Sequence, residues 1–119
     1  MAWRFNEHTP VYIQIADRLR GEIIKGMYAP GDQIPPVRQL AVMAAVNPNT
    51  VQRALLDLEA EGLLRTAGTN GRFVTDDTAV LANTKTVAAR ELVQRFLEQA
   101  AEISIHKTEL IHMIEEAEI

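Results

Sequence analysis

The stretch VNPNTVQRAL, Val46–Leu55, decides how the rest of the chain is interpreted. Asn47 is a favourable N-cap, and Pro48 then takes the first helical position, where its missing N–H has no helical partner to lose. The apolar residues that follow share one face of a helix: Val51, Ala54, Leu55 and Leu58. At about 100° of rotation per residue, the opposite face carries Asn49, Gln52, Arg53 and Leu56, with Thr50 at its flank. The stretch therefore predicts an amphipathic helix with a polar outer face near its start.

Two helices are predicted before this one. Thr9 and Pro10 favour a helix start, and apolar residues then follow at spacings of three and four: Tyr12, Ile15, Ala16, Leu19 and Ile23. Gly26 lies where that pattern fades and favours a helix end there. A loop with a turn at Pro30 and Gly31 leads to a short helix over residues 36–45, with Pro36 in its first turn. The apolar stripe of that helix is Val37, Leu40, Ala41 and Ala44.

A hairpin is predicted after the third helix, which ends at Gly62. LLRTA (63–67) and GRFVT (71–75) have the character of two short strands around residues 68–71. Asn70 followed by Gly71 is a favoured hairpin dipeptide, because both residues accept a positive φ. The order helix, helix, helix, hairpin is that of a winged helix-turn-helix, which we assign to a DNA-binding domain over residues 1–76.

The remaining residues, 77–119, are predicted to form a two-helix dimerisation region. Residues 77–86 are small and polar and are expected to form a connection. The two amphipathic helices that follow cannot bury their apolar faces alone, so they should pack on each other and on a second copy of the chain. The predicted dimer contacts are Leu92, Phe96, Ala100, Ile103, Leu110 and Ile114. The expected fold class is thus mainly α with a small β-hairpin.

Composition and charge limit the possible functions. The chain has 119 residues and no cysteine, which excludes disulfide bonds and thiolate chemistry. The net charge of −4 lies in the tail, because residues 1–76 hold eight Lys/Arg and eight Asp/Glu, whereas residues 77–119 hold four and eight. Contact with DNA in the first part therefore needs a local basic face. No signal peptide is recognisable, and no apolar stretch approaches the roughly 20 residues that span a bilayer, so we expect a cytoplasmic protein.

The outer face of the third helix has the side chains that read base edges. Arginine pairs with guanine and Asn or Gln with adenine, while a helix N-terminus and a nearby threonine can hold a phosphate. An isolated surface helix would carry such residues simply as a solvated face, but its place in this helix order favours DNA reading. Arg38 in the second helix and the hairpin tip add possible contacts to phosphate or the minor groove. The predicted DNA-binding residues are Arg38, Asn49, Thr50, Gln52, Arg53, Thr69, Asn70, Gly71 and Arg72.

Residues 10–74 resemble the DNA-binding domain of the GntR family of bacterial transcription regulators. The shared motifs are G-x-x-x-P-G-D-x-x-P at 26–35, V-R-x-L-A at 37–41, V-N-x-x-T-V at 46–51 and L-E-x-E-G-L at 58–63. The short tail is similar to that of the YtrA-like subfamily, in which two C-terminal helices form a dimer. The resemblance implies DNA contacts by Arg38, by the start of the third helix and by Gly71. Gln52 departs from the pattern, since many members have arginine there.

The expected function is a homodimeric, sequence-specific DNA-binding regulator, most simply a repressor of an operon with a pseudo-palindromic operator. The resemblance suggests genes for an ABC transporter in that operon. The alternative is a winged-helix protein-interaction module, which the neutral N-terminal part and the missing arginine at position 52 favour. We find no catalytic motif, and the spacing of His8, His106 and His112 does not suit a metal site. We therefore expect no enzyme, metal or cofactor; a small-molecule effector is left open.

Overall fold

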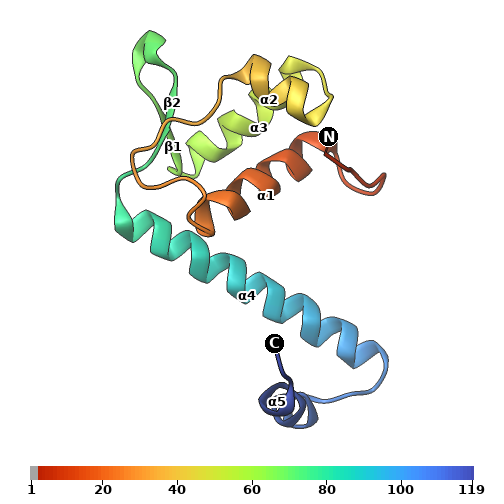
Figure 1. The fold of residues 1–119 in the computed structure, drawn as a ribbon. Helices are drawn as coiled ribbons and strands as arrows, with labels where there is room; N and C mark the ends of the chain where they lie inside the picture. The colour runs from red at the N-terminus through yellow and green to blue at the C-terminus, as the bar shows by residue number, and fades with distance from the viewer. Residues whose placement is uncertain (1–2) are drawn as a thin grey trace. The chain divides into compact units, whose positions relative to one another are not determined.

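The computed structural model describes residues 3–119. Its elements are α1 (Val11–Ile24), α2 (Val37–Ala44), α3 (Pro48–Ala60), β1 (Leu64–Thr66), the 3-10 turn η1 (Gly68–Asn70), β2 (Arg72–Val74), α4 (Thr78–Glu102) and α5 (Lys107–Glu116) (Figure 1). The strands pair antiparallel, with Leu64 opposite Val74 and Thr66 opposite Arg72. The predicted class, mainly helical with one small hairpin, is confirmed. The chain divides into two compact units, the first ending at Ala82 and the second comprising Asn83–Ile119.

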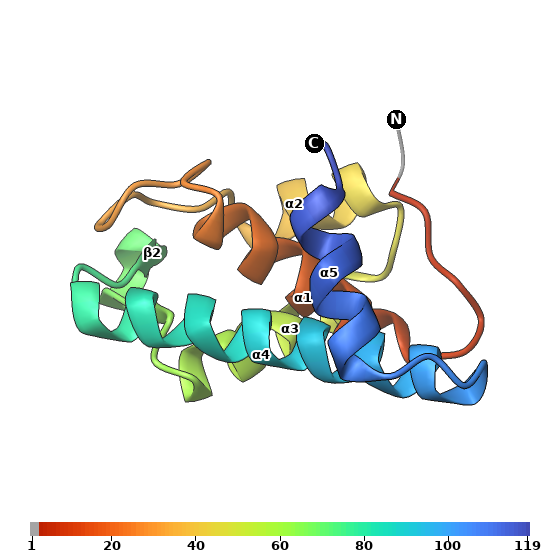
Figure 2. The same cartoon turned by 90° about the horizontal axis from the view of Figure 1, so that it is seen from below.

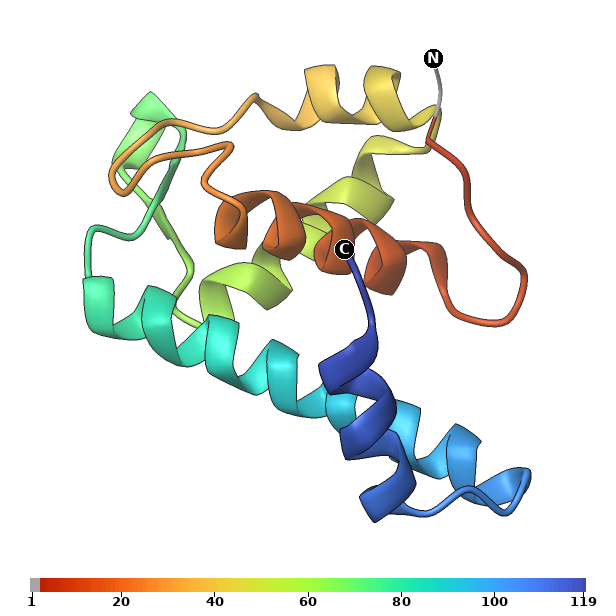
Figure 3. The same ribbon diagram turned by 60° about the horizontal axis from the view of Figure 1, so that its bottom comes forward.

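The core of the first unit lies around α3. Helix α1 packs against α3 (Figure 3), and α2 and β1 pack against α3 as well. The largest fully buried side chains are Ile15, Leu19, Leu40, Val51, Leu55, Leu58, Leu63 and Val74. The apolar faces predicted for the three helices are therefore confirmed as core. Burial of these side chains fixes the rotation of α3 about its axis, and so decides which of its residues face outward.

The start of α3 is as predicted. Asn47 is the N-cap, and its side-chain Oδ1 accepts a hydrogen bond of 2.8 Å from the backbone N–H of Asn49. Pro48 occupies the first helical position. The N–H groups of the first turn of a helix have no partner within the helix, and the cap satisfies one of them.

Two predicted helix starts are wrong by one residue. Pro10 and Pro36 precede α1 and α2 as their N-caps, rather than lying inside the first turn. The carbonyl of Pro10 accepts hydrogen bonds from the backbone N–H groups of Ile13 and Gln14. The Pro10 carbonyl is therefore the first acceptor of the helical hydrogen-bond series. The carbonyl of Thr9 instead accepts a bond of 2.7 Å from the side-chain Nε2 of Gln14.

The predicted turn at the hairpin tip is also wrong. The positive φ angles belong to Gly68 and Gly71, at 57° and 105°, and not to Asn70. The backbone N–H of Asn70 donates to the carbonyl of Ala67, which closes η1 between the two glycines. The tip therefore has its positive φ angles at the two ends of a 3-10 turn rather than at two adjacent residues.

The connection predicted over residues 77–86 is wrong, because α4 begins at Thr78 and runs unbroken to Glu102 (Figure 2). The carboxylate of Asp77 accepts a hydrogen bond of 3.0 Å from the backbone N–H of Ala79, so aspartate starts the helix. Val80 and Leu81 pack on the core of the first unit. The domain boundary that we place after residue 76 stays a prediction.

In the second unit, α4 ends in a left-handed residue, Ser104, with φ 62°. The N–H of Ser104 donates to the carbonyl of Ala101, and the N–H of Ile105 donates to that of Ala100. Of the predicted dimer residues, Ala100 and Leu110 are buried within the single chain, whereas Leu92, Phe96, Ile103 and Ile114 are exposed. Within residues 3–119, no helix has both the length and the apolar character needed to cross a membrane.

Candidate nucleic-acid interface

Helix α3 has one face in the core and one face outside. Its apolar side chains, Val51, Ala54, Leu55 and Leu58, are each at most 1% exposed. Asn49 and Arg53 are exposed on the other side, and Thr50 and Gln52 are half-buried. The predicted division of the helix is confirmed. The polar residues lie in its N-terminal half, where unpaired N–H groups and the helix dipole favour an anion such as phosphate.

Arg53 is held by α1. Its guanidinium carbon lies 3.8 Å from the centre of the Tyr12 ring, and its Nη2 donates a hydrogen bond of 3.1 Å to the Tyr12 hydroxyl. An aromatic face attracts a cation, and a guanidinium has further N–H donors that this contact leaves available. The sequence pattern predicts Tyr12 only as part of an apolar face. Its hydroxyl at the edge of that face was the one signal for a polar role.

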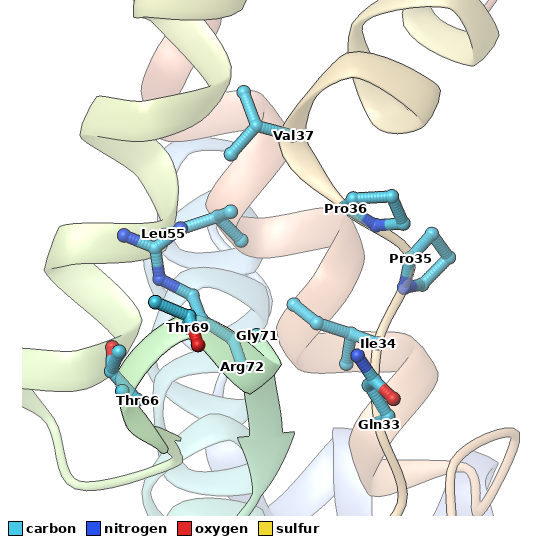
Figure 4. Close-up of a pocket in the computed structure, with 11 residues that line it drawn as sticks. Gln33, Ile34, Pro35, Pro36, Val37, Leu55, Thr66, Thr69, Gly71 and Arg72 are labelled. Atoms are coloured by element: carbon cyan, nitrogen blue, oxygen red, sulfur yellow. The ribbon is translucent and has the colours of Figure 1, made fainter.

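Arg72 points from the hairpin to α3 rather than into solvent (Figure 4). Its Nε donates to Oε1 of Glu59, and its Nη1 donates to Oε1 of Gln52 at 3.2 Å. The Thr66 hydroxyl donates to the same Glu59 oxygen at 2.7 Å. The Arg72 side chain is only 16% exposed. A phosphate at this position would therefore compete with Glu59 for the guanidinium.

The charge on Glu59 is stabilised by these partners. Burial on its own raises the pKa of Glu59, but hydrogen bonds from Arg72 and Thr66 outweigh burial and place the pKa below its ordinary value. The ionised carboxylate therefore persists at neutral pH and pairs with the arginine. No motif in the sequence directly indicates the ion pair between Arg72 and Glu59. The i, i+7 spacing of Gln52 and Glu59, which places both on one face of α3, was the only available indication.

The hairpin tip is tied to the loop before α2. Gln33 Nε2 donates a hydrogen bond of 2.8 Å to the carbonyl of Asn70, and the N–H of Ile34 donates to the carbonyl of Arg72 at 3.0 Å. A Cβ on Gly71 would lie 2.6 Å from Gln33 Nε2, so only glycine fits there unless that side chain moves. Thr69 and Asn70 are exposed at the tip. A hollow of about 270 Å³ separates this hairpin from the segment 33–37, with Leu55 on its wall (Figure 4).

Arg38 is exposed near the start of α2. It borders a shallow hollow together with Asn47 and Pro48, which places it beside the N-terminus of α3. In the part of the chain that the structure describes, no acidic side chain forms an ion pair with Arg38. Arg38 is thus an available cation next to the helix end that best accepts an anion.

The structure joins the predicted site residues into pairs rather than one cluster. Gln52 is bonded to Arg72, Arg38 borders the start of α3, and Arg53 rests on Tyr12. Contact of each predicted residue with DNA stays a prediction.

Residues 11–74 match the family model described as bacterial regulatory proteins, gntR family. The chain belongs to the GntR family. It is 32% identical over 111 residues to the uncharacterized HTH-type transcriptional regulator YhcF of Bacillus subtilis, covering 93% of this chain and 92% of that protein. It is 34% identical over 92 residues to the HTH-type transcriptional repressor YtrA of the same organism, covering 76% of this chain and 71% of that protein.

Solved structures of GntR regulators have the same fold. A GntR family transcriptional regulator from Listeria monocytogenes superposes with a TM-score of 0.88 at 31% identity, over 96% of this chain and 100% of that chain. The DNA-binding domain of AraR, solved in complex with operator ORX1, superposes with a TM-score of 0.58 at 25% identity, over 63% of this chain and 95% of that chain. This GntR protein is a DNA-binding transcription regulator and not an enzyme, which confirms both predictions.

Proposed function

We propose that this GntR protein is a homodimeric repressor that binds a pseudo-palindromic operator with α3 in the major groove. The observation that carries the proposal is the outer face of α3. The apolar side chains of α3 are buried in the core, whereas Asn49 and Arg53 are exposed near the unpaired N–H groups of the first turn. Asparagine, glutamine and arginine are the side chains that distinguish base pairs in that groove. YtrA, to which the chain is similar, is named a repressor.

The second copy of the chain would cover the apolar residues of α4 and α5. Phe96 is 43% exposed, and Leu92, Ile103 and Ile114 are each at least 59% exposed. Side chains of this size lose favourable burial when they face water. A symmetric dimer would bury the same patch on both protomers. Ala100 and Leu110 are already buried in one chain, so a second copy would add little to their burial.

The proposed operator belongs to the protein's own operon, with ABC transporter genes as the resemblance to YtrA-like regulators implies, and repression would take place in the cytoplasm. The two-fold axis of the dimer requires an inverted repeat. Its half-sites should lie about one helical turn apart, because each α3 enters a successive major groove on one side of the duplex.

Selection of bound duplexes from a random pool tests the proposal. We expect one inverted repeat to be enriched at moderate salt, and sedimentation of the free protein to give a dimer at micromolar concentration. Phe96→Glu should shift that equilibrium to monomer and abolish enrichment of the repeat. Equal retention of all duplexes would refute sequence-specific binding. A monomeric wild type would refute the dimer.

Two arginine variants separate base reading from phosphate contact. Arg53→Ala should weaken binding to the selected operator more than binding to a random duplex, because a base contact contributes only at the correct sequence. Arg38→Ala should weaken both by similar factors, because a phosphate is present in every duplex. Equal losses on both duplexes for both variants would contradict this division of roles.

A further inference from the structure

The contact between Gln52 and Arg72 links the reading helix to the hairpin. Gln52 lies in the N-terminal half of α3, and its side-chain oxygen accepts a hydrogen bond of 3.2 Å from Nη1 of Arg72. Arg72 cannot move freely, because its Nε is bonded to Glu59, which lies about two helical turns further along the same face of α3. Glu59 in turn is fixed by the Thr66 hydroxyl of β1. The guanidinium is thus bonded to two residues of α3, one of which is also bonded to β1.

This contact permits only one orientation of the Gln52 amide. A guanidinium has five N–H donors and no acceptor, whereas an amide has an oxygen acceptor on one side and an NH₂ donor on the other. Turning the amide over would set its NH₂ against the N–H groups of Arg72. The oxygen must therefore face Arg72, and the NH₂ group is the part of the side chain that remains for another partner.

An amide held in this way recognises a different base from a free one. A free glutamine pairs with adenine by accepting from N6 and donating to N7. An amide that presents its NH₂ group suits guanine, whose N7 and O6 are both acceptors, and meets a second donor at N6 of adenine. We propose that Arg72 is a positioning residue that turns Gln52 into a hydrogen-bond donor and so selects guanine over adenine at one base pair of each half-site. The inference rests on the proposed function, in which α3 reads the operator.

The test compares duplexes selected by matched variants of the full-length protein. Gln52→Ala identifies the base pair that Gln52 reads, as the position whose preference is lost. At that position the wild type should favour guanine over adenine by about tenfold or more, since a good bidentate contact discriminates on that scale. Arg72→Met removes the donor to the Gln52 oxygen. It should shift the preference toward adenine by about tenfold and leave the other positions unchanged.

Two further variants separate positioning from loss of charge or of fold. Arg65→Met removes a neighbouring hairpin arginine that lies over the Phe73 ring and does not contact Gln52, so it should leave the base preference unchanged. Arg72→Met combined with Glu59→Gln leaves no unpaired carboxylate, and it should show the same shift if the single variant folds poorly. In the Gln52→Ala background, Arg72→Met should no longer change any base preference.

The outcomes also separate this inference from the proposed function. If the wild type enriches no sequence, the proposed function itself fails. If an operator is enriched but the position assigned by Gln52→Ala favours adenine, or keeps its preference in both Arg72 variants, only the role of Arg72 is refuted. If Gln52→Ala changes no position, Gln52 does not read a base, and the inference is refuted in the same way.

Discussion

Replacing Gly71 with alanine tests how the hairpin tip is held. Gly71 has φ 105° and ψ −162°, a conformation that is nearly exclusive to glycine, so a side chain there costs roughly 1–3 kcal/mol. The new Cβ would lie 2.6 Å from Gln33 Nε2, which must move and lose its hydrogen bond to the Asn70 carbonyl. A hydrogen bond of this kind contributes about 0.5–1.5 kcal/mol. The expected loss for an intact hairpin is therefore about 1.5–4.5 kcal/mol.

Gly68→Ala is the matched control on the other side of η1. Gly68 has φ 57°, in the left-handed helical region, and no atom lies within 4 Å of a Cβ built there. Its expected cost is only about 1–2 kcal/mol. In the double variant Gln33→Ala, Gly71→Ala, the close contact is absent, but the unfavourable φ remains. Measured against Gln33→Ala alone, Gly71→Ala should therefore cost only the backbone part, roughly 1–3 kcal/mol.

Urea unfolding followed by circular dichroism measures the global free energy of unfolding, and hydrogen exchange of the hairpin amides measures local opening. The global loss cannot exceed the free energy of opening the hairpin alone, so hydrogen exchange should show the larger effect. Equal effects of Gly71→Ala and Gly68→Ala in both measurements would refute the reasoning. So would the absence of any loss for Gly71→Ala in the Gln33→Ala background, because the backbone conformation would then cost nothing.

Three further variants test other parts of the first unit by urea unfolding. Asn47→Ala removes the cap of α3 and should lower the free energy of unfolding by about 1 kcal/mol, while Asn47→Asp should keep most of it; equal losses would exclude capping as the cause. Ala45→Gly relieves φ 58° at the end of α2 and should raise the free energy of unfolding by about 0.5–1 kcal/mol. The control Ala60→Gly, at a helical position, should lower it. Because the pKa of Glu59 is lowered on folding, its stabilising effect is present above the pKa of an unfolded glutamate, about 4.3, and is lost as the pH falls through the folded pKa. The difference between wild type and Glu59→Gln should therefore shrink in acid, and a constant difference would contradict it.

Helix ends show what the sequence could predict and what it could not. Gly26 and Gly62 follow α1 and α3 with φ of 84° and 81°, and glycine is the residue that signals such an end. Helices α2 and α4 end in the same conformation at Ala45 and Ser104, residue types that give no signal for it. In α2, the N–H groups of Ala45 and Val46 donate to carbonyls in the last turn, and these bonds offset the unfavourable φ. The left-handed conformation at these two helix ends is therefore determined by the neighbouring residues and their hydrogen bonds, and not by the residue type at the position.

The sequence predicts which face of α3 points outward at the candidate site, but not which side chains contact one another there. The rotation of α3 follows from the spacing of its apolar residues, so its outer face could be named from the sequence alone. The contact between Arg53 and Tyr12 depends on how α1 packs against α3. The contact of Arg72 with Gln52 and Glu59 depends on the strand register that sets Arg72 opposite Thr66. Packing and register join residues far apart in the chain, and local patterns do not specify them.

The first 76 residues have no net charge, yet the candidate DNA-binding surface can still be locally basic. Ion pairs in this part of the chain neutralise several of its acidic side chains. Arg20 is bonded to Asp17 and Glu61, which ties α1 to the end of α3, and Arg72 is bonded to Glu59. Arg38 and Arg53, among the described residues, have no acidic partner, and the dipole of α3 adds positive potential at its N-terminus.

Of the three arginines predicted to contact DNA, Arg38 and Arg53 are thus the ones without an acidic partner among the described residues, so few of these cations are available for phosphate. The logarithm of the binding constant falls by about 0.9 per phosphate contact for each tenfold rise in salt, so one protomer alone should show a shallow salt dependence and weak binding. Under the proposed function, the exposed apolar residues of α4 and α5 then have a direct role in affinity. By joining two protomers they double the number of phosphate contacts, and the second half-site binds at the high effective concentration set by the first.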